Sequence, residues 1–72
     1  MTTHANDNFP ILISIKDAAS LTSLSRPQIN VLRGREEFPA AVSLGDRRIA
    51  FVRAEVIQWT QARIAARPQR AA

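Results

Sequence analysis

Arginine and carboxamide side chains gather at two places in this 72-residue chain, and both places suit the recognition of DNA. Arg26, Asn30 and Arg33 recur at spacings of four and three, which put side chains on neighbouring rows of one helix. Arg47 and Arg48 stand together between two short apolar runs. A guanidinium binds phosphate or guanine through two parallel hydrogen bonds, and a carboxamide can do the same with adenine. These residue types predict binding to double-stranded DNA.

Each position in the first group has a DNA-contacting interpretation and a plainer one. Arg26 opens the expected helix, where it contacts a base or a phosphate or else is a solvated arginine. Asn30 either pairs with adenine or is an exposed asparagine that the helix tolerates, and Val31 either touches a thymine methyl or packs beneath a hairpin. Arg33 and Arg35 are expected at the DNA backbone. The candidate DNA-binding residues are Ser25, Arg26, Pro27, Gln28, Asn30, Val31, Arg33, Arg35, Arg47 and Arg48.

A first helix and a tight turn are expected to hold the first group in place. Ser14, followed three residues later by Asp17, resembles a capping box and predicts a helix of about two turns that ends near Thr22. Ser23 stands where the helix-turn-helix pattern prefers glycine for its positive φ. A slightly different turn is therefore expected here.

A second helix follows at once. Ser25 with Gln28 forms a second capping box, and Pro27 lies in the first turn, where its missing N–H costs nothing. These signals already explain Pro27 and Gln28 without DNA. The helix is expected to run from Arg26 to Arg33 and to be ended by Gly34.

The second group of arginines is expected at the tip of a β-hairpin. Residues 41–44 and 49–52 flank Gly45-Asp46-Arg47-Arg48, which would be the wing of a winged helix. Which arginine faces DNA depends on the turn register, which the sequence leaves open. A short apolar run, Ile11 to Ile13, is expected to be a strand or an extended segment packed on the core.

A third helix, residues 54–67, closes the predicted domain. Glu55 lies near its start and Arg67 near its end, where each charge suits the helix dipole. Arg63 is expected to stack on Trp59. The expected apolar side holds Val56, Ile57, Trp59, Thr60 and Ile64, and the large aromatic residues Phe38, Phe51 and Trp59 are expected in the core.

The predicted fold class is α+β, mostly helical: a winged helix-turn-helix with three helices and a two-stranded hairpin wing. One domain is expected at residues 9–67, with flexible tails at 1–8 and 68–72. The formal charge of +4 and the isoelectric point near 11.5 are typical of nucleic-acid binders. The chain has no cysteine, so no disulfide supports this small domain.

Composition argues against several other classes of protein. The only histidine, His4, lies in an expected tail, and the carboxylates are scattered, so no catalytic residue, metal site or cofactor is expected and the protein is not predicted to be an enzyme. With only two glycines, there is no phosphate-cradling loop. No apolar run approaches the roughly 20 residues of a membrane span. A cytoplasmic, nucleoid-associated protein with no membrane partner is expected.

From Leu12 to Ala65 the chain resembles the AlpA family of small prophage regulators, which are similar to MerR proteins and phage excisionases. The resemblance is carried by Ser25-Arg26 with Ile29, by Phe38-Pro39, by Leu44-Gly45-Asp46-Arg47, and by residues 55–59 with Arg63. The chain departs from the family pattern at Asn30, Ala41 and Phe51. The departure at Asn30 leaves any inherited base preference open.

The resemblance implies a role in the control of a mobile element. The chain would be an excisionase, also called a recombination directionality factor, or a transcriptional regulator, acting at an attachment site or a promoter with a tyrosine integrase as partner. Because one small domain covers a short site, cooperative self-association on DNA is also expected. The alternative is a protein-interaction module that acts on an integrase or a repressor without touching DNA.

Overall fold

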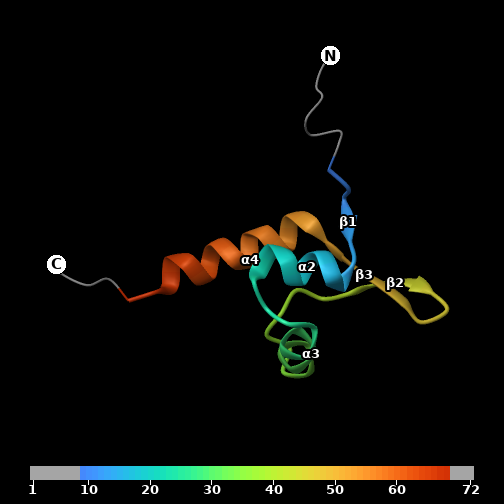
Figure 1. Cartoon of the computed structure of the whole chain (residues 1–72), viewed down its shortest axis with the longest axis horizontal. Helices are drawn as coiled ribbons and strands as arrows, with labels where there is room; N and C mark the ends of the chain where they lie inside the picture. Colours follow the sequence, from blue (N-terminus) through green and yellow to red (C-terminus); the bar gives the residue numbers. More distant parts are fainter. Residues whose placement is uncertain (1–8, 69–72) are drawn as a thin grey trace, which may run out of the picture.

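The computed structural model describes residues 9–68, so the expected tail at 1–8, and all of the expected tail at 68–72 except Pro68, lie outside the described residues. Three helices and a small antiparallel sheet give the α+β, mostly helical fold that the sequence predicts (Figure 1). In chain order the elements are β1 (Leu12–Ile13), α2 (Ile15–Thr22), α3 (Arg26–Gly34), β2 (Val42–Gly45), β3 (Arg48–Val52) and α4 (Arg53–Ala66).

The sheet has three strands in the order β1-β3-β2, so the expected apolar strand pairs with the second strand of the hairpin. Ile13 pairs with Phe51 on one side of β3, while β2 pairs on the other side. The expected four-residue tip is wrong, because Gly45 pairs with Arg48 and only residues 46 and 47 remain in the turn. A register shift at Leu44 allows this pairing, since one extra residue is accommodated in β2.

Both predicted helix starts are confirmed by their hydrogen bonds. Ser14 Oγ accepts from the backbone N–H of Asp17 at 3.1 Å. At α3 the capping box is complete: Ser25 Oγ accepts from Gln28 N at 3.2 Å, and Gln28 Oε1 accepts from Ser25 N at 2.8 Å. These bonds satisfy N–H groups that have no partner inside their helix, which defines where α2 and α3 begin.

Ser23 caps α2 in the left-handed conformation, with φ 63° and ψ 20°. The turn between α2 and α3 therefore has the positive φ for which the helix-turn-helix pattern prefers glycine, although serine stands here. A residue with a Cβ pays roughly 1 kcal/mol or more in this region. The turn stores this strain because the two capped helices on either side determine its path.

Ser23→Gly is expected to stabilise the domain by roughly 0.5 to 1 kcal/mol, since relief of the left-handed strain exceeds the added freedom of glycine in the unfolded chain. Thermal melting followed by circular dichroism should rise by a few degrees. Ser23→Val is the matched opposite, because a β-branched side chain fits this region worst, and it should lower the melting temperature. Equal melting of both variants would contradict this view of the turn.

The end of α3 differs from the prediction. Gly34 lies inside the helix, Arg35 is the C-cap, and the left-handed residue is Glu36, with φ 59°. The helix is prolonged because Arg35 N still donates to Val31 O at 3.2 Å and Glu37 N donates to Leu32 O at 2.8 Å. Termination by Gly34 is therefore wrong, since backbone bonds of the following turn set the boundary.

The core lies where α2, α3 and α4 meet one face of β3. Phe51, Ile29 and Val56 are its largest fully buried side chains, and Phe38 is also buried. The Phe38 ring packs edge-on against Phe51 at 5.4 Å and against Trp59 at 4.9 Å between centroids. Phe38 and Phe51 confirm the expected aromatic core, while Trp59 is half-buried at its edge.

Helix α4 is only partly covered by the rest of the domain. Val56 is fully buried, but Ile64, expected on the apolar packing side, is 53% exposed. All residues from 61 to 68 are exposed because this end of α4 extends past α2, as Figure 1 shows. The expected packing of Ile64 is therefore wrong, since helical periodicity does not reveal where the covering element stops.

Candidate nucleic-acid interface

The first turn of α3 is exposed and held firmly. Ser25, Arg26, Pro27 and Gln28 all lie at the surface, and the capping box fixes the backbone that carries them. The Ser25 and Gln28 side chains are engaged in the hydrogen bonds of the capping box. Arg26 is the cationic side chain of this turn and takes no part in those bonds. The N-terminus of a helix also favours anions, because its first N–H groups point outward.

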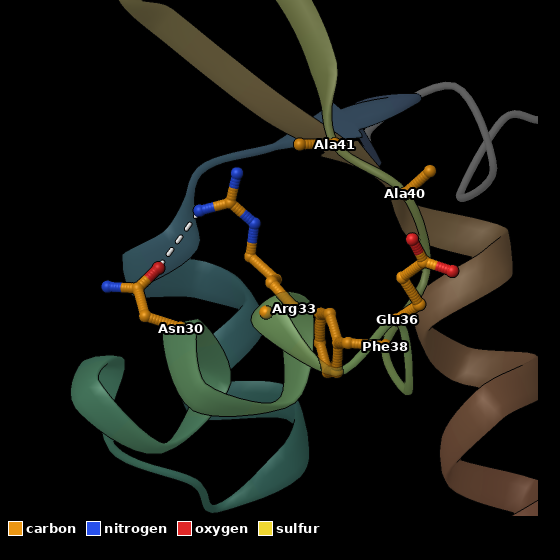
Figure 2. Close-up of a pocket in the computed structure, with 7 residues that line it drawn as sticks. Asn30, Arg33, Glu36, Phe38, Ala40 and Ala41 are labelled. Atoms are coloured by element: carbon orange, nitrogen blue, oxygen red, sulfur yellow. Dashed lines mark hydrogen bonds between the residues drawn. The ribbon is translucent and has the colours of Figure 1, made fainter.

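One side of α3 faces the loop that leads to β2. Asn30, Arg33 and Gly34 line an open pocket whose other lining residues are Glu36, Phe38, Ala40 and Ala41 (Figure 2). Arg33 Nη1 donates to Asn30 Oδ1 at 2.9 Å, and the guanidinium carbon lies 5.8 Å from the centroid of the Phe51 ring. Arg33 is half-buried in this position, whereas Asn30 is exposed. The two side chains are thus joined by a hydrogen bond at the surface of α3.

The other side of α3 faces α4. Val31 is 52% exposed and lines a shallow groove with Pro27, Leu32 and Arg63. Packing of Val31 beneath the hairpin, one of the two alternatives, is therefore wrong, because the groove lies between the two helices. Arg63 stacks on Trp59 at 5.4 Å, which confirms that expectation.

Both wing arginines, Arg47 and Arg48, are exposed, and the hairpin register now separates their positions. Arg47 is in the turn with φ 69°, after Asp46 with φ 48°. Two successive positive φ values are typical of the two-residue hairpin turn whose twist matches that of the strands. Arg48 begins β3 and, by strand alternation, points to the face opposite Ile49 and Phe51. Arg47 is the outermost of the two.

The loop after α3 connects the candidate surface to the core through a hydrogen bond. Arg35, Glu36 and Glu37 are exposed, and the backbone oxygen of Glu37 accepts from Trp59 Nε1 at 3.0 Å. No charged side chain is buried among residues 9–68, so every cation there is available at the surface or at its edge. Sequence patterns did not predict the Asn30–Arg33 bond, although their i,i+3 spacing could have suggested it.

Two kinds of feature are absent from the described part. Within residues 9–68 no three His, Cys, Asp or Glu side chains come close enough to hold a metal ion. Among the helices seen there, none has the length and apolar character needed to cross a bilayer. Exposed guanidinium and amide donors on α3 and the wing can bind phosphate oxygens and base edges.

Comparison with known proteins places the chain among phage-related sequences. A family model described as prophage CP4-57 regulatory protein (AlpA) matches residues 12–64. The uncharacterized protein ORF88 of Enterobacteria phage P4 is 38% identical over 55 residues, which make up 76% of this chain. The match spans 62% of the phage protein, less than two thirds of its length. No solved structure matches the chain.

Proposed function

Because this chain belongs to the AlpA family of prophage regulatory proteins, we propose that it binds double-stranded DNA with α3 in the major groove and the wing beside it. The observation that carries this proposal is the exposed first turn of α3, held by a complete capping box and carrying Arg26. A rigid helix start with a free guanidinium suits both phosphate and base contacts.

The wing supplies the second part of the proposed surface. Arg47 and Arg48 are both exposed, and the two-residue turn places Arg47 at the outer end of the hairpin. A side chain there can reach a phosphate or the minor groove next to the major groove occupied by α3. Arg35, exposed at the end of α3, would add a contact to the phosphate backbone of the DNA. The protein would perform no chemistry itself.

Such a surface covers only a short stretch of DNA, so useful affinity requires neighbouring copies that bind cooperatively. The target would be an attachment site or a promoter, and the partner a tyrosine integrase. At such a target the protein would act either as a recombination directionality factor or as a transcriptional regulator. Integrase-driven excision and promoter activity, each measured with and without this protein, distinguish these two roles. Stimulation of excision identifies a recombination directionality factor, whereas a change in promoter activity alone identifies a transcriptional regulator.

A salt series tests the proposed DNA binding directly. If about four arginines neutralise phosphates, log K should fall with log salt concentration with a slope of about −3 to −4. Arg47→Gly should reduce this slope by about one, because it removes one phosphate contact. Arg67→Ala is the control, since Arg67 is an exposed arginine at the C-cap of α4. A flat salt dependence, or equal effects of both variants, would contradict the proposed surface.

A second candidate function is a protein-interaction module that acts on an integrase or repressor without touching DNA. It is favoured by the exposed apolar side chains Val31 and Ile64, which line neighbouring grooves between α3 and α4. A DNA-binding measurement at low salt distinguishes the two candidate functions, because electrostatic attraction between the protein and DNA is strongest there. Absence of DNA binding there would leave the interaction module as the better explanation.

A further inference from the structure

Asn30 and Arg33 form one hydrogen-bonded unit on the exposed side of α3. Arg33 Nη1 donates to Asn30 Oδ1 at 2.9 Å. A guanidinium has donors and no acceptor, so the amide atom that faces it must be the carbonyl oxygen. The amide nitrogen of Asn30 therefore points away from Arg33, as Figure 2 shows.

The surroundings of Arg33 keep this arrangement in place. Its guanidinium carbon lies 5.8 Å from the centroid of the Phe51 ring, and Phe51 is fully buried in β3. Arg33 is thus held between α3 and the sheet, half-buried, with its charge over an aromatic face. Turning the Asn30 amide over would set two N–H groups against each other, so the orientation of the amide is determined by Arg33.

We infer that this pair reads guanine instead of adenine, an inference that rests on the proposed DNA binding. In the major groove guanine shows two acceptors, O6 and N7, whereas adenine shows the N7 acceptor and the N6 donor. Asparagine recognises adenine by accepting from N6 through Oδ1 while donating to N7. In this chain Oδ1 already accepts from a cation, and the unit offers the outside N–H donors from both side chains.

Contact with adenine would weaken the unit, while contact with guanine leaves it intact. To accept from adenine N6, Asn30 must share or give up a charge-assisted hydrogen bond, which is among the stronger kinds. Guanine needs only the amide NH₂ and the guanidinium N–H groups that Asn30 does not use. Guanine should therefore be preferred at this base pair by roughly tenfold or more.

Selection of binding sites from a random duplex library tests the inference with the full chain. The base pair contacted by the unit is identified as the position at which the protein loses its base preference in Asn30→Ala. We expect guanine there, and 7-deazaguanine at that position should lower affinity by about tenfold. Adenine at that pair would overturn the inference while leaving the proposed DNA binding intact. Absence of DNA binding at low salt would overturn both the inference and the proposed DNA binding.

Asn30→Asp gives the sharpest variant, since it keeps the shape and the bond to Arg33 but replaces donors by acceptors. Cytosine presents a donor, N4, to carboxylates, so the preferred base should change from guanine to cytosine. Gln58→Glu is the control, because it adds the same charge at an exposed position of α4, outside the proposed surface, and should leave the preferred base unchanged. An unchanged preference in Asn30→Asp would overturn the inference.

Arg33→Met separates the positioning role of Arg33 from its charge. Without the guanidinium, Asn30 Oδ1 is free to accept from adenine, so the preference for guanine over adenine should fall toward unity. Overall affinity also falls, but the base preference is a ratio and does not depend on that loss. A preference for guanine that survives in Arg33→Met would show that Arg33 does not orient Asn30.

Discussion

Arg26→Ala is expected to weaken binding to the selected DNA site by roughly 5- to 150-fold, which corresponds to the loss of about 1 to 3 kcal/mol of base discrimination. Binding to unrelated DNA should fall much less, so the preference for the site is lost along with affinity. The reason is geometric: Arg26 is the first residue of α3, exposed, on a backbone fixed by the Ser25 and Gln28 cap.

Fluorescence anisotropy with selected and scrambled duplexes at one salt concentration measures both affinities. Arg67→Ala controls for the loss of one positive charge, and its site preference should equal that of the unchanged protein. Circular dichroism should show the same melting for Arg26→Ala and the parent chain, because Arg26 takes no part in the capping box or the core. If Arg26→Ala kept its preference for the selected site, α3 would not be the reading element.

Phe51→Ala is expected to remove a large part of the stability of the protein. Removal of a fully buried phenylalanine costs about 3 to 5 kcal/mol, while a domain of this size has a total stability of about 4 to 11 kcal/mol. The loss is severe here because Phe51 touches two layers at once: Phe38 packs on its ring, and Arg33 lies over it. Neighbouring side chains cannot collapse into the space without moving α3.

Urea unfolding followed by circular dichroism measures this effect. Phe9→Ala deletes the same ring from a position that is 52% exposed, so it should change the free energy of unfolding by much less. Similar unfolding midpoints for the two variants would show that Phe51 is not the centre of the core. Because Phe51 itself is buried, Phe51→Ala can weaken DNA binding only indirectly, through loss of structure or through Arg33, which lies over its ring.

The two predicted helix starts illustrate what sequence alone can decide. Ser14 and Ser25 accept hydrogen bonds from residues three positions later, and Pro27 fits the first turn because it needs no donor there. All of these interactions join residues that are close in the chain. Their energies depend little on the rest of the fold, so residue types and spacing are sufficient to predict them.

The candidate base contact at Asn30 shows where such reasoning ends. Considered as an isolated carboxamide, Asn30 indicates adenine. The structure changes the expected chemistry, because Arg33 engages its oxygen and Phe51, 18 positions beyond Arg33, holds the guanidinium in place. No local sequence pattern specifies the position of β3 relative to α3. The orientation of the Asn30 amide therefore could not be predicted from the sequence.

Arginine placement, helix caps and the alternation of apolar residues were enough to determine that this chain forms a winged arrangement with cationic side chains on α3 and the hairpin. The tertiary structure decided the two-residue turn that separates Arg47 from Arg48, the exposure of Ile64, and the orientation of Asn30. The first set follows from interactions within a few residues. The second depends on which distant surfaces meet, and that is settled only when the helices pack on the sheet.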